Sequence, residues 1–366
     1  MPGGVLSYQK DYKSDNLTSY LKGFDFRVGT LECAIGTDIP FEPLKLSENG
    51  GNDNVCYARD EDFFRLKELG LDAVSLANNH AFDLGREGLM HTISLLNNKG
   101  IVSFGAGMTL DEAAKPYIFD FGEYKIALIG CCIRGISPIN VIAATNDSYG
   151  VYQPSIEELI NQIKEIKASC DFVFILPHWG EEHVLFPPYK NVKYSQLMID
   201  AGADGVFGSH SHCISTNIKY NGKDIFFGLG NFLYPDFCMM PPRPFYYPSS
   251  EEELMGLDKC INYPKSIKKT TLSVWSNDSR LGMCAEVDID KQNVNTHKKL
   301  VRISNDNILM LNKEYSKVSD IVYRLIKQPT YNLLTRPSIY KVLHKGIMYV
   351  SKRKLRYLGD FRKRLV

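Results

Sequence analysis

The chain lacks an excess of charge of either sign and lacks long apolar runs. Its 43 lysines and arginines face 42 aspartates and glutamates, so the formal net charge is +1. No global field therefore attracts polyanions, and we expect no nucleic-acid partner. No window approaches the roughly 18 apolar residues of a membrane-spanning helix. The N-terminal segment has neither the basic nor the apolar part of a signal peptide.

The chain also lacks paired cysteines. Its nine cysteines are scattered, odd in number and form no CxxC motif. This pattern argues against a disulfide framework and against a cysteine zinc site, and it favours a reducing compartment. We therefore expect a cytoplasmic protein. With 366 residues, 44% of them hydrophobic and 23% charged, the chain has the composition of a globular protein.

Five short apolar runs each lead into polar side chains. Bounded by Gly, Pro or Asn, such runs are typical of strands that are covered on both faces. The runs and the polar residues that follow them are 26–31 with Glu32, 72–77 with Asn78, Asn79 and His80, 171–176 with His178, 205–208 with His210 and His212, and 224–229 with Asn231.

Helical patterns lie between these strands. The segment 60–70 begins with acids and ends at Gly70, the segment 155–169 opens with the capping-box pair Ser155 and Glu158, and 194–201 ends before Gly202. Alternating strands and helices predict an α/β sheet. Because ligands bind at the carboxyl ends of the strands in such sheets, we expect the polar clusters to converge there.

The pattern changes after residue 236. We predict a main domain over 1–305, with core motifs in 26–237, a loop excursion over 238–268 and closing strands in 270–303. Within these, 270–275 and 281–288 alternate like antiparallel strands joined through 277–279. A helical extension is predicted over 306–366. Its end, 351–366, carries seven basic residues against one acid; a solvated helix is the favoured interpretation, and docking to an anionic membrane surface or an acidic partner is the alternative.

The polar residues at the strand ends have the chemistry of a metal site. Imidazole and carboxylate groups suit zinc, manganese or iron. His210 and His212 flank Ser211, so both rings can reach two neighbouring ions if this segment of the backbone is extended. An acid such as Glu32 can bridge two ions about 3.5–4 Å apart. The candidate residues are Glu32, Asn79, His80, Asp83, His178, Glu182, His210, His212 and Asn231.

Four motifs resemble, in order, those of the CapA family of capsule and poly-γ-glutamate biosynthesis proteins, relatives of the calcineurin-like metallophosphoesterases. They occupy 78–83, 178–182, 200–212 and 228–232, and the resemblance extends to about residue 237. It implies an α/β (α+β) fold of the metallophosphoesterase type, a four-layer α-β-β-α sandwich with one or two divalent metal ions at the strand ends.

The resemblance also implies residue roles. Glu32, Asn79, His178, His210 and His212 match metal ligands, with Glu32 as the bridge. His80 matches the residue near the leaving group, and Asp83 and Glu182 would orient neighbouring groups. Asn78, Asn231 and Trp179 are possible substrate or supporting residues; packing is the favoured role of Trp179, and Asn231 either caps a turn or faces the site.

Three features depart from the family pattern. Thr30 replaces an Asn before Leu31-Glu32, and Ser211 replaces a Pro between the two histidines. The family's first strand, which ends in a metal-binding Gly-Asp, has no counterpart after Met1. We therefore expect either a longer natural protein or a one-metal or inactive form, in which Asn79, His178 and His210 keep one ion while Glu32 and His212 hold the other poorly.

Two functions follow from these residues. The first is a metal-dependent hydrolase of phosphoester or related bonds in extracellular-polymer or cell-envelope metabolism. The alternative is a non-catalytic accessory factor of a membrane-associated capsule or polymer synthase, held near the membrane by its basic C-terminus.

Overall fold

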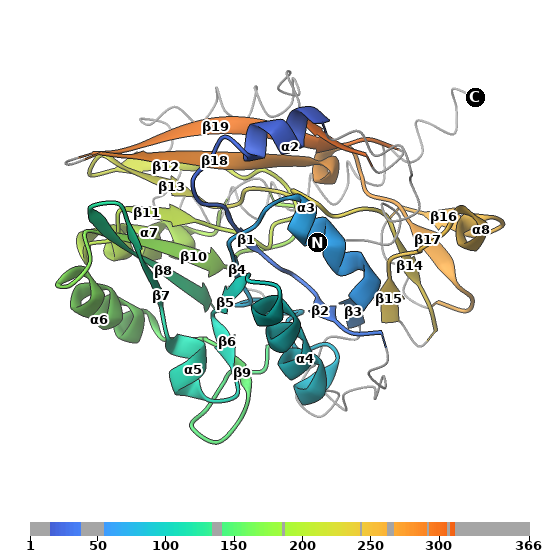
Figure 1. Ribbon diagram of the computed structural model, residues 1–366, viewed down its shortest axis with the longest axis horizontal. Coiled ribbons are helices and arrows are strands. Elements are labelled where there is room, and N and C mark those ends of the chain that lie inside the picture. The colour runs from blue at the N-terminus through green and yellow to red at the C-terminus, as the bar shows by residue number, and fades with distance from the viewer. Residues whose placement is uncertain are drawn as a thin grey trace.

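Two β-sheets lie face to face, with helices on their outer sides (Figure 1). The computed structural model describes residues 15–37, 55–133, 141–184, 187–241, 244–261, 267–290, 293–305 and 308–311. The central sheet has the strand order β12-β13-β11-β10-β8-β7, in which β8, β10, β11 and β13 are parallel and the two edge strands are antiparallel to their neighbours. Its strands are β7 (Tyr117–Phe121), β8 (Tyr124–Cys132), β10 (Phe172–His178), β11 (Gly205–Phe207), β12 (Asn217–Tyr220) and β13 (Lys223–Phe226).

The inner strands β8 and β10 are buried on both faces: every residue of β10 is buried, as is β8 from Ile126 onward. Along β10, Val173 and Ile175 pack with side chains from α6 (Ile156–Lys167) and α7 (Tyr189–Asp200). The alternate residues Phe172 and Phe174 face the other way, toward the second sheet. Ser155 and Glu158 form the predicted capping box at the start of α6.

The second sheet is formed by β1 (Val28–Thr30), β4 (Ala73–Ser75) and β5 (Val102–Phe104), all parallel. Ala73 and Phe104 pack toward the central sheet. Val74 faces the opposite way and shares a core with Leu89 of α4 (Gly85–Asn98). The order helix, sheet, sheet, helix confirms the predicted α/β class and four-layer arrangement.

The remaining elements flank these layers. In Figure 1, β18 and β19 run along the top next to β12 and β13, and Phe226, Met283 and Leu300 form a shared core there. The remaining strands are β2 (Ala34–Ile35), β3 (Val55–Ala58), β6 (Ala106–Gly107), β9 (Gly150–Val151), β14 (Phe237–Met239), β15 (Pro244–Tyr246), β16 (Asp258–Cys260), β17 (Thr271–Ser273), β18 (Leu281–Ile289), β19 (Val294–Ile303) and β20 (Leu309–Leu311). The other helices are α2 (Asp15–Leu21), η2 (Asp60–Phe63), α3 (Phe64–Glu68), α5 (Leu110–Ala114), α8 (Glu251–Leu254) and η3 (Asp278–Arg280).

Two predictions for the second half of the chain were wrong. The expected loop excursion over 238–268 contains β14, β15 and β16, which join a six-stranded sheet of order β16-β17-β14-β15-β3-β2. The segments 270–275 and 281–288 do not pair: β17 pairs with β14 and β16, whereas β18 pairs with β19. Arg280 lies in η3, between β17 and β18, and forms a buried ion pair with Asp236. This pair holds the chain at the point where it passes from one sheet to the other.

The predicted boundary at residue 305 lies within a sheet, because β20 pairs with β19 beyond it. The rest of the predicted helical extension, including 351–366, lies outside the described residues. The expectation about the family's first strand concerns sequence before residue 15 and also lies outside them. None of the described helices is long and apolar enough to cross a membrane.

Candidate metal centre

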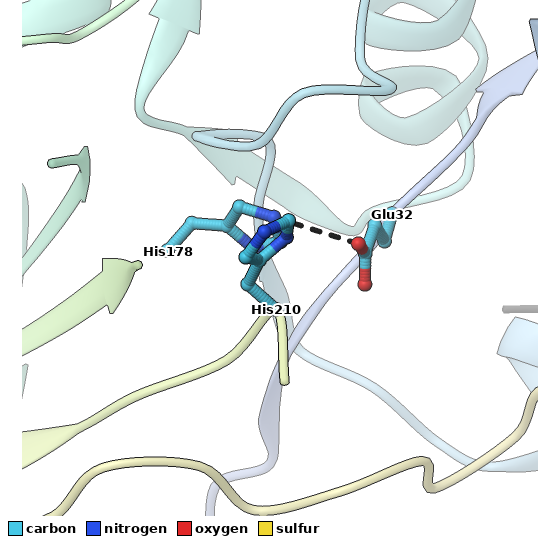
Figure 2. Close-up of side chains that lie close together, drawn as sticks. All are labelled: Glu32, His178 and His210. Atoms are coloured by element: carbon cyan, nitrogen blue, oxygen red, sulfur yellow. Dashed lines mark ion pairs between the residues drawn. The ribbon is translucent and has the colours of Figure 1, made fainter. Parts of the chain in front are cut away.

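Three buried side chains meet where the two sheets present their strand ends. Glu32 follows β1, His178 ends β10 and His210 follows β11. One ligand atom from each residue lies within 4.8 Å of the others. Figure 2 shows the two imidazole rings side by side with the Glu32 carboxylate pointing toward them, and Glu32 Oε1 lies 3.4 Å from His178 Nε2.

The backbone of the His210-Ser211-His212 turn is unusual. His210 and His212 have φ angles of 89° and 48°, in the region that non-glycine residues rarely adopt. The Ser211 hydroxyl donates to the carbonyl of Cys213 at 2.7 Å, a contact that supports the turn. The turn directs both imidazoles toward Glu32, since His212 Nε2 lies 3.5 Å from Glu32 Oε1.

Neighbouring groups orient two of the histidines. Asn231 Oδ1 lies 3.0 Å from His212 Nδ1, and Asn231 Nδ2 donates to the Ser279 carbonyl at 2.8 Å. With its hydrogen on Nδ1, His212 directs the Nε2 lone pair at the centre, as metal-binding histidines usually do. Asn79 Oδ1 lies 2.7 Å from His178 Nε2, and Ser209 Oγ lies 2.9 Å from His178 Nδ1.

His80 sits beside the centre as a buried ion pair. Its Nδ1 lies 2.6 Å from Asp83 Oδ2, and its backbone N–H donates to Asn78 Oδ1 at 2.9 Å. Burial alone would lower the pKa of His80, but the Asp83 carboxylate outweighs burial and raises this pKa to about 9. Asp83 also accepts from the backbone N–H of Cys56 at 2.6 Å, and Asn78 donates to the Leu31 carbonyl.

His178 and His210 are held in the neutral form. Burial lowers the pKa of His210 to about 3 and holds the pKa of His178 well below its usual range, with the neighbouring imidazoles adding to the effect for His178. Neutral imidazole is the form that binds a metal ion, because its lone pair is free.

Two atoms of the cluster have unmet bonding capacity within the described part of the chain. Glu32 Oε1 and His210 Nδ1 are buried and have no hydrogen-bond partner. Buried polar atoms are nearly always satisfied in folded proteins. A divalent cation would satisfy both, and the donor set of carboxylate and imidazole suits such an ion. The residues present therefore fit a metal ion.

Two predicted residues, Trp179 and Glu182, are not members of the Glu32–His178–His210 cluster. Trp179 is buried, donates from Nε1 to the Phe227 carbonyl at 3.0 Å and stacks on the Phe227 ring, so its contacts are those of a packing residue. Glu182 is exposed in the loop after β10, near enough to His210 and His212 for electrostatic interaction.

The sequence prediction missed three residues beside the centre. Trp275 packs against the His212 ring at a centroid distance of 5.4 Å, and Ser279 binds Asn231. His183 lies 6.0 Å from the His212 ring, centroid to centroid. Trp275 and Ser279 follow no strand of the central sheet, so the strand-end pattern carried no signal for them. His183 does follow such a strand, and a count of every histidine after β10 would have included it.

Residues 3–236 match the model of the bacterial capsule synthesis protein PGA_cap family. The chain belongs to this family. The PGA_cap match ends just before the β14–β17 region, so Trp275 and Ser279 lie outside it.

Among named PGA_cap relatives, the capsule biosynthesis protein CapA of Bacillus anthracis is 27% identical over 63% of this chain and 55% of its own length. A probable polyglutamine synthesis accessory protein of Mycobacterium tuberculosis is 30% identical over 48% of this chain and 49% of its own length. The chain thus spans about half the length of these relatives. A solved putative 5′-nucleotidase of Staphylococcus aureus shows a weak likeness, with a TM-score of 0.38 and 15% identity over 74% of this chain and 52% of that chain.

Proposed function

We propose that this protein is a divalent-metal-dependent hydrolase that cleaves a phosphoester or related bond during the synthesis of a capsule or polyglutamate polymer. One observation carries the proposal: Glu32, His178 and His210 converge from three strand ends and leave Glu32 Oε1 and His210 Nδ1 buried without partners. Membership of the capsule synthesis family supports the polymer context.

Glu32, His178 and His210 would hold one ion, and His212 together with Glu32 extends the site toward a second. Manganese, zinc and iron all suit this donor set. A bound divalent ion would act as a Lewis acid on the scissile bond. Asn79, in contact with His178, would add an amide oxygen to the ligand set.

His80 would assist departure of the leaving group. Asp83 fixes its Nδ1, so the opposite nitrogen, Nε2, is the one left to transfer a proton. The Asn78 side chain ties the His80 backbone to the residue before Glu32, because it binds both His80 N and the Leu31 carbonyl. This linkage keeps the proton donor at a fixed place relative to the metal ligands.

The test uses the full chain, Mn²⁺ or Zn²⁺, and bis(p-nitrophenyl) phosphate. We expect turnover that disappears with EDTA and in His80→Asn. His91→Asn is the matched control, because His91 pairs with Asp60 on the surface. Turnover that persists without metal or in His80→Asn would contradict the proposal. So would the absence of turnover by the wild type with both Mn²⁺ and Zn²⁺.

A second candidate is a non-catalytic accessory role beside a membrane-associated polymer synthase. The name of the mycobacterial relative, an accessory protein, favours it. In this case the protein would lie in the cytoplasm, with 351–366 as the membrane-docking segment. Polymer production by cells that carry His80→Asn in place of the wild type would support the accessory role, and loss of production would exclude it. Fractionation of cells with and without 351–366 tests the docking.

A further inference from the structure

His183 shares an uncommon backbone feature with the candidate metal ligands. Among the described residues, four non-glycine residues have a positive φ, and three of them are His183, His210 and His212. The left-handed conformation costs about 1–2 kcal/mol for such residues, and strain of this kind concentrates at functional sites. The His183 backbone N–H donates to the Ser211 carbonyl at 2.7 Å, which joins the two strained segments.

His183 is an exposed residue, whereas His178, His210 and His212 are buried. It lies 6.0 Å from the rings of both His212 and Trp275, centroid to centroid. His183 therefore lies on the solvent side of the centre, the side from which a substrate must approach.

Ser279 determines which nitrogen of His183 is available. The Ser276 hydroxyl donates to Ser279 Oγ at 3.3 Å, which leaves the Ser279 hydrogen for His183 Nδ1, 3.1 Å away. When Nδ1 accepts, the ring hydrogen is on Nε2; when the ring is protonated, both nitrogens carry one. In either charge state His183 Nε2 is a hydrogen-bond donor.

We propose that His183 is a substrate-binding residue whose Nε2–H donates to an anionic oxygen of a phosphoryl group at the metal centre, and that Ser279 holds the imidazole in place. The inference rests on the proposed function for the class of substrate. Glu182, the preceding residue, interacts electrostatically with His183, His210 and His212, and its negative charge opposes the binding of an anion. The donor of His183 and the metal charge act against that repulsion.

The experiment measures the Kd of inorganic phosphate for the Mn²⁺-loaded full chain by calorimetry, and separately the Kd of Mn²⁺. Asn tolerates a left-handed backbone and places its amide near the position of Nδ1, so His183→Asn keeps the Ser279 contact and removes the Nε2 donor. Gln places an amide near the position of Nε2. We expect His183→Asn to weaken phosphate binding about tenfold or more, the size typical of a hydrogen bond to a charged group, and His183→Gln to restore part of it.

Ser279→Ala should weaken phosphate binding by a smaller factor, about threefold, because the ring loses its anchor but keeps its donor. Glu182→Gln should tighten it. All four variants should bind Mn²⁺ within about twofold of the wild type, and His297→Asn, an exposed histidine paired with Asp288, serves as the control.

Unchanged phosphate affinity in His183→Asn would overturn the inference, as would a matching loss of Mn²⁺ affinity or the absence of phosphate binding by the Mn²⁺-loaded wild type. Phosphate binding that depends on His183, without any hydrolysis, would leave the inference standing and reject the hydrolase.

Discussion

Glu32 has unfavourable surroundings for a carboxylate. Its side chain is buried, and Oε1 has two imidazoles within 3.5 Å but no hydrogen bond in the described structure. A buried carboxylate that lacks full compensation destabilises a fold. A bound cation would compensate the charge of the Glu32 carboxylate and so account for a buried acid at this position.

Glu32→Gln should therefore change stability in opposite directions with and without metal. Without metal, removing the buried charge should raise the free energy of unfolding by about 1–3 kcal/mol. With Mn²⁺, the variant should bind the ion at least about a hundredfold more weakly, since even supporting residues typically contribute ten- to a hundredfold.

Urea unfolding with EDTA and calorimetry with Mn²⁺ measure the two effects. Glu181→Gln, in a partly exposed position of the loop after β10, is the control and should show neither. If Glu32→Gln binds Mn²⁺ as tightly as the wild type, Glu32 is not a ligand.

Sequence reasoning reached the residues that follow parallel strands, because their positions depend on one rule. Glu32, His178 and His210 each end an apolar run, and parallel strands bring such ends to one edge. Ser279 could not be found this way. Its place at the centre depends on the turn after β17 and on the Arg280–Asp236 ion pair, which join segments distant in sequence.

The loop from β11 to His210 depends on a glycine. A Cβ on Gly208 would lie 2.4 Å from both the Phe227 carbonyl oxygen and Trp179 Nε1. Gly208→Ala should therefore break the Trp179–Phe227 hydrogen bond and cost about 1–3 kcal/mol, as overpacking does.

Gly29→Ala in β1 is the matched control, because no atom lies within 4 Å of its added Cβ. Thermal unfolding monitored by tryptophan fluorescence measures both variants. Equal midpoints for Gly208→Ala and Gly29→Ala would show that the segment before His210 adapts freely.

The Asp236–Arg280 ion pair fixes η3 against the end of the family-matched region. Arg280 Nη2 lies 2.7 and 2.8 Å from the two carboxylate oxygens, and Asp236 also accepts from the backbone N–H of Trp275. Removing one partner of a buried ion pair typically costs about 3–5 kcal/mol because the other charge is stranded.

We accordingly expect Arg280→Met to lower the free energy of unfolding by that amount, and the double variant Asp236→Asn with Arg280→Met to recover part of it. Urea denaturation provides the measurement. A double variant that is less stable than Arg280→Met would contradict this account. Arg27→Met, which breaks a partly exposed pair with Asp72, should have a smaller effect.

Strands could be predicted from the sequence where all their residues are buried in the same way. The inner strands β8 and β10 are covered on both faces, so their apolar runs stand out in the sequence. The strands β14, β15 and β16 are three residues each and lie among prolines and aromatic residues. β14 pairs with the nearby β15, and β16 with the nearby β17, whereas β3, the other partner of β15, lies far away in sequence. Strands of three residues are too short to show a periodicity, so the sequence did not reveal this sheet.

The candidate ligands connect separate layers of the molecule, and a bound ion would therefore act on global stability. An ion that binds only the folded state adds about 2.7 kcal/mol at a hundred times its Kd. We predict that Mn²⁺ raises the thermal midpoint and EDTA reverses the rise, measured by differential scanning fluorimetry. In His178→Ala with His210→Ala the midpoint should not respond to Mn²⁺. A response as large as that of the wild type would place the ion elsewhere.

The linkage from Ser279 through Asn231 to His212 has a consequence for how the chain matures. Residues of the centre come from 32 to 279, and parallel strand pairs form slowly because each requires a long loop to close. A nascent chain on the ribosome cannot orient His212 until η3 has left the exit tunnel. Capture of a cation would thus be a late event in biogenesis, and an ion bound at full affinity would report that every layer of the fold is already in place.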